Sequence, residues 1–125
     1  MKSKGGPARL FKALRYSWQG IRAAIRHEAA FRQELMLSLP LLPCTPWVAQ
    51  GSLHALGLVG VWVAVWVVEL LNSAVEALAD QQSLEKMPLL GRAKDLGSAA
   101  VLLTLSFALL VWGQALWTWL QALPP

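Results

Sequence analysis

Polar side chains recur at steps of three and four residues within an otherwise apolar stretch of the sequence. They are Glu69, Asn72, Ser73, Glu76 and Asp80. In a helix they would share one face about 100° wide. Glu69 would lie about 16 Å along the axis from Asp80, at a depth where a charge in lipid costs a few kcal/mol unless it is paired or reaches water. If Asn72 and Ser73 were the only polar residues here, hydrogen bonding between helices would explain them. Two carboxylates on the same intramembrane face indicate a functional role instead.

Residues 91–95, with the sequence GRAKD, add two cations and a carboxylate near the same end of this face. Carboxylates can hold Mg²⁺, a further carboxylate can orient or deprotonate a hydroxyl, and a lysine can meet phosphate charge. These are the parts that phosphoryl transfer requires. The sequence has no G-x-x-x-x-G-K-[ST] loop, so a nucleotide would be held in another geometry. An ion or proton path is the alternative use of such carboxylates.

Two long uncharged tracts must position these residues. No Asp, Glu, Lys or Arg occurs between Glu34 and Glu69, and none follows Asp95. A helix crosses the hydrocarbon with roughly 20 residues, so the first tract can hold two spans and the second tract one. The chain is also 56% hydrophobic and only 14% charged, which is unusual for a soluble domain. We therefore predict an all-α integral membrane protein, a single membrane domain over residues 1–125 with spans at 35–49, 53–80 and 95–121.

An amphipathic surface helix is predicted over residues 8–33. Its apolar residues cluster on one side of the helical wheel and most of its basic residues on the other, as in helices that lie on a membrane. The apolar residues are Leu10, Leu14, Trp18, Ile21 and Ile25, and the basic ones are Lys12, Arg15, Arg22 and Arg26. Glu28 falls inside the apolar stripe, where a carboxylate needs a cation or a proton. Pro40, Pro43 and Pro46 predict a short, kinked or unwound first span.

The basic residues predict the orientation in the membrane. They all precede the first span or lie between the second and third spans: Lys2, Lys4, Arg9, Lys12, Arg15, Arg22, Arg26, Arg32, Lys86, Arg92 and Lys94. The positive-inside rule then places the N-terminus in the cytoplasm and the C-terminus outside, in the cytoplasmic (inner) membrane of a bacterium. Because these cations adjoin spans, anionic lipid is a better partner than nucleic acid for the net charge of +4. Cys44 is the only cysteine, which excludes an internal disulfide.

Three stretches in order resemble the prokaryotic diacylglycerol kinase family: residues 28–34 (EAAFRQE), 69–80 (ELLNSAVEALAD) and 91–99 (GRAKDLGSA). Lys12, Tyr16, Ser17 and Trp18 of the surface helix also fit the family. The resemblance implies a homotrimeric bundle of three-span subunits that share their active sites. ATP and Mg²⁺ would approach from the cytoplasm and a lipid hydroxyl from the bilayer. An oligomer is expected independently, because three spans do not easily bury the polar face.

The resemblance also implies roles for individual residues. Glu69 would be the general base, and Glu28 and Glu76 would hold the metal ions that bridge the ATP phosphates. Nucleotide binding would involve Arg9, Tyr16, Glu28, Glu76, Glu85, Lys86, Gly91, Arg92, Lys94 and Asp95. Lipid-substrate binding would involve Arg9, Glu34, Glu69, Asn72, Ser98 and Trp112. The loop after Asp80 departs from the family, with Gln81 where relatives have Arg and Met87 where they have His.

The leading hypothesis is an ATP-dependent lipid kinase that transfers the γ-phosphate of Mg-ATP to 1,2-diacylglycerol and forms phosphatidic acid. An undecaprenol kinase would use the same face, but residues 28–34 and 91–100 are more similar to the diacylglycerol branch. A small oligomeric proton or ion conductor is the alternative from another class, and it would not need Glu28 or residues 94 and 95. A purely structural membrane adaptor would leave Glu69 unexplained.

Overall fold

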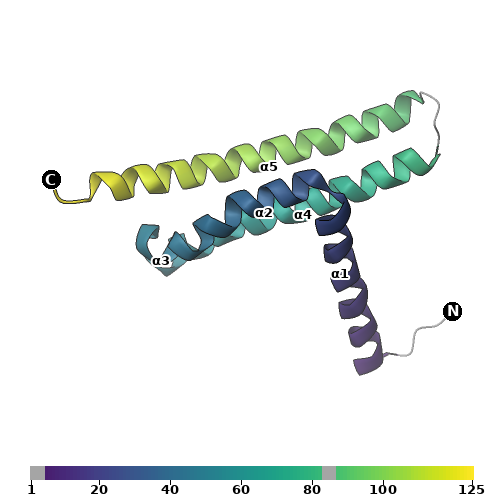
Figure 1. Ribbon diagram of the computed structural model, residues 1–125, viewed down its shortest axis with the longest axis horizontal. Coiled ribbons are helices and arrows are strands. Elements are labelled where there is room, and N and C mark those ends of the chain that lie inside the picture. The colour runs from purple at the N-terminus through teal and green to yellow at the C-terminus, as the bar shows by residue number, and fades with distance from the viewer. Residues whose placement is uncertain (1–4, 83–86) are drawn as a thin grey trace.

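The computed structural model of the protein describes residues 5–82 and 87–125. All regular elements in this part of the chain are helical, which confirms the predicted all-α class. In chain order they are α1 (Pro7–His27), α2 (Ala29–Leu41), a 3₁₀ turn (Leu42–Cys44), α3 (Thr45–Val48), α4 (Ser52–Gln82) and α5 (Pro88–Gln121). Figure 1 shows α4 and α5 as a long antiparallel pair, with α2 alongside α4 and α1 projecting away from the pair.

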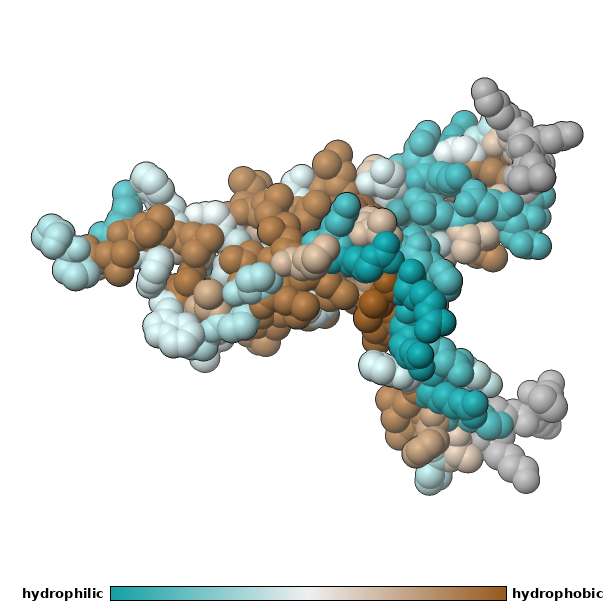
Figure 2. Space-filling view, in the orientation of Figure 1, coloured by the Kyte–Doolittle hydropathy of each residue, from teal (hydrophilic) through white to brown (hydrophobic). Residues whose placement is uncertain are grey.

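Two described helices, α4 and α5, are long and apolar enough to cross a membrane. Many of their large apolar side chains face outward, among them Leu71, Leu102 and Leu110, each more than three-fifths exposed. A soluble protein rarely exposes so much apolar surface, whereas a bilayer covers it. These features are those of an integral membrane protein. In Figure 2 the apolar side chains occupy the middle of the helix pair, and polar ones gather at the end where α4 ends and α5 begins.

Prolines divide the predicted first span. Pro40 lies inside α2, Pro43 lies in the 3₁₀ turn, and Pro46 opens α3. Each proline lacks the backbone N–H that would bond to the carbonyl four residues earlier. The uninterrupted helix α2 has 13 residues, about 20 Å, which is shorter than the hydrocarbon thickness of about 30 Å. The predicted interruption of this segment is present.

Helix α1 has the predicted amphipathic pattern but ends earlier than expected. Leu10, Leu14 and Trp18 are each about three-fifths exposed on its apolar side, and Figure 2 shows polar side chains along the other side. The single helix predicted over residues 8–33 is divided at Glu28, whose backbone is extended (φ −109°, ψ 104°). The division lets α1 leave the helix pair at the sharp angle seen in Figure 1.

Helices α4 and α5 both extend into the segment that separates the predicted spans 53–80 and 95–121. Helix α4 continues to Gln82, and α5 begins at Pro88. Proline suits the first turn of a helix because the N–H it lacks would have no intrahelical partner there. Gly91, which falls between the predicted spans, lies inside α5. Lys94 and Asp95 are therefore held on a regular helix.

A tryptophan-rich core joins α3, α4 and α5 at the end of the pair where α4 begins and α5 ends. Its fully buried side chains include Leu58, Trp62, Val65 and Trp112. Trp112 Nε1 donates a hydrogen bond of 2.9 Å to the backbone oxygen of Leu58. We call residues 52–68 of α4 and 105–121 of α5, with α3, the tryptophan half. Residues 69–82 of α4 and 88–98 of α5 are the acidic half.

Candidate active site

The polar face predicted on α4 is present and becomes more exposed toward the end of the helix. Glu69 is 4% exposed and Asn72 is 8% exposed. Glu76 is half-buried and Asp80 is exposed. A single helix thus carries a row of acidic and amide groups from the interior of the helix pair to its polar end.

Glu34 of α2 meets Glu69 in the interior. Phe31, Glu34 and Ser38 are buried at steps of three and four, so they form the face of α2 that packs on α4. The carboxyl groups of Glu34 and Glu69 interact directly, and Glu34 Oε2 has no hydrogen-bond partner among the described residues. Two adjacent buried carboxyl groups are unfavourable unless a proton or a cation lies between them. Binding of a proton or a cation between Glu34 and Glu69 is therefore favourable.

Asn72 lies between Glu69 and Glu76 in the sequence of the polar face and bonds to Glu76. Its Nδ2 donates a hydrogen bond of 3.3 Å to Glu76 Oε1. Its Oδ1 is buried and has no partner among the described residues, and the same is true of the Ser73 hydroxyl. Such groups are rare in folded proteins, where buried polar atoms are usually satisfied. The site therefore has hydrogen-bonding capacity that the single chain does not use.

Glu28 lies at the elbow between α1 and α2. Its N–H donates to Ala24 O at 2.9 Å and its carbonyl accepts from Arg32 N at 3.2 Å, so its backbone ends one helix and begins the next. The charges of Glu28 and Glu76 both act on the Glu69 carboxyl. The elbow thus brings a further carboxylate toward the polar face of α4. Glu28 was predicted to lie inside the apolar stripe of the surface helix, but it lies in the break between two helices.

Arg32 secures this elbow, and the sequence reasoning missed its role. Its Nη1 donates to Ile25 O at 2.9 Å and to Arg26 O at 3.1 Å. Those carbonyls end α1 and have no intrahelical partner, and a cation there also interacts well with the helix dipole. The available signal was a basic residue four positions after Glu28, inside a stretch already singled out.

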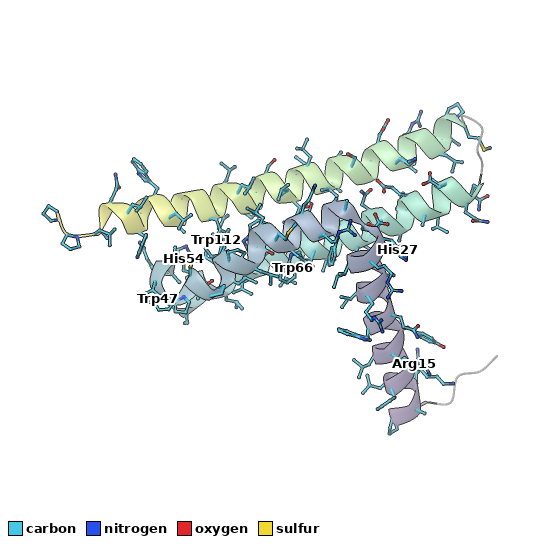
Figure 3. All side chains as sticks on the ribbon, viewed as in Figure 1. Arg15, His27, Trp47, His54, Trp66 and Trp112 are labelled. Carbon is cyan, nitrogen blue, oxygen red and sulfur yellow. The ribbon has the colours of Figure 1, made fainter. Side chains whose placement is uncertain are left out.

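A cavity of ≈ 520 Å³ lies between α1 and α4. Its lining is mainly apolar and includes Gly20, Ile21, Ala24, Leu70 and Ala74, with the polar residues Ser17, His27, Glu28 and Ser73. Figure 3 shows His27 at the junction of α1 with the helix pair. The cavity therefore has an apolar wall and a carboxylate at one edge, which suits a molecule with an apolar body and a polar end.

The exposed end of the face carries an ion pair between the two long helices. Lys94 Nζ donates to Asp80 Oδ1 at 2.9 Å. Lys94 precedes the uncharged tract of α5, and its hydrogen bond to Asp80 and the Asp80 charge raise its pKa. Gly91, Arg92 and Asp95, which are close to Lys94 in the sequence, are also exposed. The acidic half thus ends in a protonated amine beside carboxylates.

Comparison with known proteins identifies the family of this chain. Residues 15–116 match the prokaryotic diacylglycerol kinase family. The chain belongs to this family. It is 42% identical over 113 residues to the diacylglycerol kinase of Escherichia coli strain K12, covering 90% of this chain and 93% of that protein. The family assignment decides between the enzyme and ion-conductor hypotheses in favour of a diacylglycerol kinase.

Other bacterial diacylglycerol kinases show similar agreement. The one from Pseudomonas aeruginosa is 39% identical over 115 residues, with 92% of this chain and 94% of that protein covered. The one from Haemophilus influenzae is 38% identical over 108 residues, with 86% and 92% covered. The matches therefore extend over nearly the whole length of the relatives, so the resemblance seen in three sequence stretches is confirmed.

Other residues that the kinase resemblance assigns to the site are separated in the single chain. Arg9 and Tyr16 are exposed on α1, and Arg9 lies 19 residues before Glu28 at the elbow, about 28 Å along the helix. Ser98 is exposed on α5. Trp112 is 2% exposed in the tryptophan half, away from His27 in Figure 3. Glu85 and Lys86 lie outside the described residues.

The two carboxylates predicted to hold metal ions in this kinase fit Mg²⁺. No group of three or more Asp, Glu, His or Cys side chains among residues 5–82 and 87–125 forms a metal cage. Mg²⁺ does not need one, because it is commonly held by one or two carboxylates together with substrate phosphates and water. Glu28 is half-buried at the elbow and Glu76 accepts only from Asn72 within the described chain. Both side chains offer the hard oxygen ligands that Mg²⁺ prefers.

Proposed function

We propose that this diacylglycerol kinase transfers the γ-phosphate of ATP to the hydroxyl of 1,2-diacylglycerol, giving phosphatidic acid and ADP, with Glu69 as the general base. The observation that carries the proposal is the burial of Glu69 against Glu34 on a face that leads to Lys94. As the lipid oxygen attacks the γ-phosphorus, a Glu69 oxygen takes the hydroxyl proton and the bond to the β-phosphate oxygen breaks. A carboxylate held out of water is well suited to this proton transfer.

The nucleotide is proposed to bind at the exposed end of the acidic half. Lys94 would meet phosphate charge, and Arg92, Asp95 and Gly91 lie within one helical turn of it. Glu28 and Glu76 would hold Mg²⁺, which neutralises the charge that develops on the phosphate oxygens. Arg9, Tyr16, Glu85 and Lys86 remain predictions from the family resemblance for the same end.

The lipid is proposed to approach from the bilayer along the α1–α4 cavity. Its apolar wall is compatible with an acyl chain, and Glu28 and Ser73 lie where the polar end of the lipid would sit. Glu34 and Asn72 would contact the part of the lipid that carries the hydroxyl. Asn72 lies on the same face of α4 as Glu69, and Glu34 faces Glu69 from α2. Ser98 and Trp112 stay predictions for lipid contact farther along α5.

A homotrimer with shared sites is also proposed, in an inner membrane with the N-terminus cytoplasmic. One observation supports the homotrimer: Arg9 and Tyr16 lie far along α1 from the elbow of their own chain. A neighbouring subunit would bring these two residues to the site. The segment from α2 to α3, 20 residues long, would cross the membrane as the predicted first span and bring the number of spans to three.

Labelled phosphate transfer to two lipids tests the substrate. The purified protein would be given γ-labelled Mg-ATP in mixed micelles that contain either 1,2-diacylglycerol or undecaprenol at equal mole fraction. We expect label in phosphatidic acid at a rate at least about tenfold above that in the polyprenol product, a difference of about 1.4 kcal/mol in transition-state binding. Preferential labelling of undecaprenol would contradict the proposed substrate, and labelling of neither lipid would contradict the kinase assignment.

A further inference from the structure

Gly97 on α5 lies directly against Asn72 on α4. A methyl group at Gly97 would overlap Asn72 Oδ1, and its carbon would lie 3.2 Å from Asn72 Cγ. At each of the other glycines of the described chain, an added methyl group would meet no other side chain within 4 Å. Among the glycines, only Gly97 lies so close to another side chain that a methyl group would overlap it.

The amide of Asn72 is held at only one of its two ends. Nδ2 donates to Glu76 Oε1 at 3.3 Å, while Oδ1 is buried against Gly97 with no hydrogen-bond partner in the described chain. The space above Gly97 thus decides whether Oδ1 can point toward α5. If Oδ1 points toward α5, Nδ2 points along α4 toward Glu76.

We propose that Gly97 is a positioning residue of the kinase that acts through Asn72 on Glu76. By leaving room for Asn72 Oδ1, it keeps Nδ2 on the Glu76 carboxylate and so fixes the direction in which that carboxylate offers its free oxygen. The inference rests on the proposed role of Glu76 in holding Mg²⁺. It adds a residue of α5 to the proposed Mg²⁺ site, whose carboxylates lie on α4 and at the α1–α2 elbow.

The expected fault in Gly97→Ala is local. The overlapping atom of Asn72 ends a rotatable side chain, so the amide can turn away without moving either helix backbone. Turning it away breaks the hydrogen bond to Glu76, which is then free to take other rotamers. Alanine also has a higher helix propensity than glycine, which favours the folded state. Catalysis should therefore suffer while folding does not.

The test compares Gly97→Ala with Gly113→Ala, which lies on the same helix but has open space around it. Initial rates would be measured against Mg²⁺ and against diacylglycerol, together with thermal unfolding. For Gly97→Ala we expect a loss of about tenfold in kcat and a severalfold rise in the Mg²⁺ needed for half-maximal rate, since positioning errors at a site are costly. KM for diacylglycerol and the unfolding temperature should stay close to wild type. Gly113→Ala should match wild type throughout.

Three outcomes would overturn the proposal: unchanged Mg²⁺ dependence in Gly97→Ala, failure of that variant to fold, or an equal loss of activity in Gly113→Ala. A second background locates the effect. In Asn72→Ala there is no amide to overlap, so adding Gly97→Ala should change the residual rate by less than about twofold. A further loss of about tenfold in that background would mean that Gly97 does not act through Asn72.

Glu76→Gln separates this inference from the proposal it rests on. If Glu76→Gln shows the Mg²⁺ dependence of wild type, the metal role of Glu76 is wrong, whatever Gly97→Ala does. If Glu76→Gln alters the Mg²⁺ dependence and Gly97→Ala does not, only the positioning role of Gly97 is wrong.

Discussion

The two halves of the helix pair differ in the kinds of polar group that they bury. In the tryptophan half, the indoles of Trp112 and Trp66 donate to Leu58 O at 2.9 Å and to Ser38 Oγ at 3.2 Å, and large side chains fill the space. Two neutral groups of this half, the Trp62 indole and the Thr45 hydroxyl, are buried without a partner in the described chain. In the acidic half and on the face of α2 that packs on it, the atoms without such a partner belong to Glu34, Asn72 and Ser73 and include a carboxyl oxygen. The first half is a packed apolar scaffold, and the second half gathers the carboxyl and amide groups that substrates or metal ions can use.

This contrast is consistent with the general finding that functional sites depart from the packing rules that the rest of a fold obeys. Figure 3 shows Trp66 and Trp112 in the scaffold, away from the junction at His27. Substitutions in the two halves should therefore have separable effects. Those in the acidic half should reduce catalysis, and those in the tryptophan half should reduce stability.

The elbow offers the largest of three effects. Arg32→Gln removes the cation that bonds to Ile25 O and Arg26 O, so α1 and Glu28 should lose their fixed direction. We expect phosphate transfer to diacylglycerol to fall about tenfold, because charge-assisted hydrogen bonds are strong and small displacements at a site are costly. Arg22→Gln, on the exposed polar side of α1, is the matched control. Equal rates in the two variants would show that Arg32 does not position the elbow.

A smaller effect is expected from the ion pair at the exposed end. Asp80→Asn should raise KM for ATP by at most about fivefold, because solvent weakens ion pairs between exposed side chains. Asp80 raises the pKa of Lys94, so the variant should lose the protonated amine at lower pH. The alkaline limb of its pH–rate profile should therefore shift to lower pH than in wild type. An unshifted limb would mean that Lys94 does not act as a cation in the reaction.

The smallest effect on catalysis is expected in the tryptophan half. Trp66→Phe removes the hydrogen bond to Ser38 Oγ and should lower the free energy of unfolding by about 1 kcal/mol. Phosphate transfer should stay within about twofold of wild type. Trp117→Phe, at a side chain 63% exposed, is the control and should change neither quantity. A large catalytic loss in Trp66→Phe would contradict the separation of the two halves.

The sequence predicts the acidic half well because helical periodicity is a strong signal. Glu69, Asn72, Glu76 and Asp80 occupy one face as the steps of three and four require. Their approach to Lys94 also follows from the sequence, since the connection between the two helices is short. The amphipathic pattern of α1 and the interruption by prolines in the predicted first span were recognisable for the same kind of reason.

Features that depend on tertiary contacts were not predictable. The helix break at Glu28 carries no Gly or Pro signal, and it depends on hydrogen bonds from Arg32 to carbonyls six and seven residues earlier. Gly91 resembled a loop residue, yet it lies inside α5, where neighbouring residues outweigh its low helix propensity. The special position of Gly97 exists only because α5 packs on Asn72.

The central claim is that the buried carboxylate of Glu69 carries the proton transfer, and Glu69→Gln tests it most directly. Transfer of labelled γ-phosphate from Mg-ATP to diacylglycerol would be measured in mixed micelles for wild type, Glu69→Gln and Trp66→Phe. The account predicts that Glu69→Gln folds like wild type but loses activity by 10²–10⁴-fold, on the order of what a general base contributes, while Trp66→Phe stays active. A Glu69→Gln enzyme within a few-fold of wild type would contradict the account.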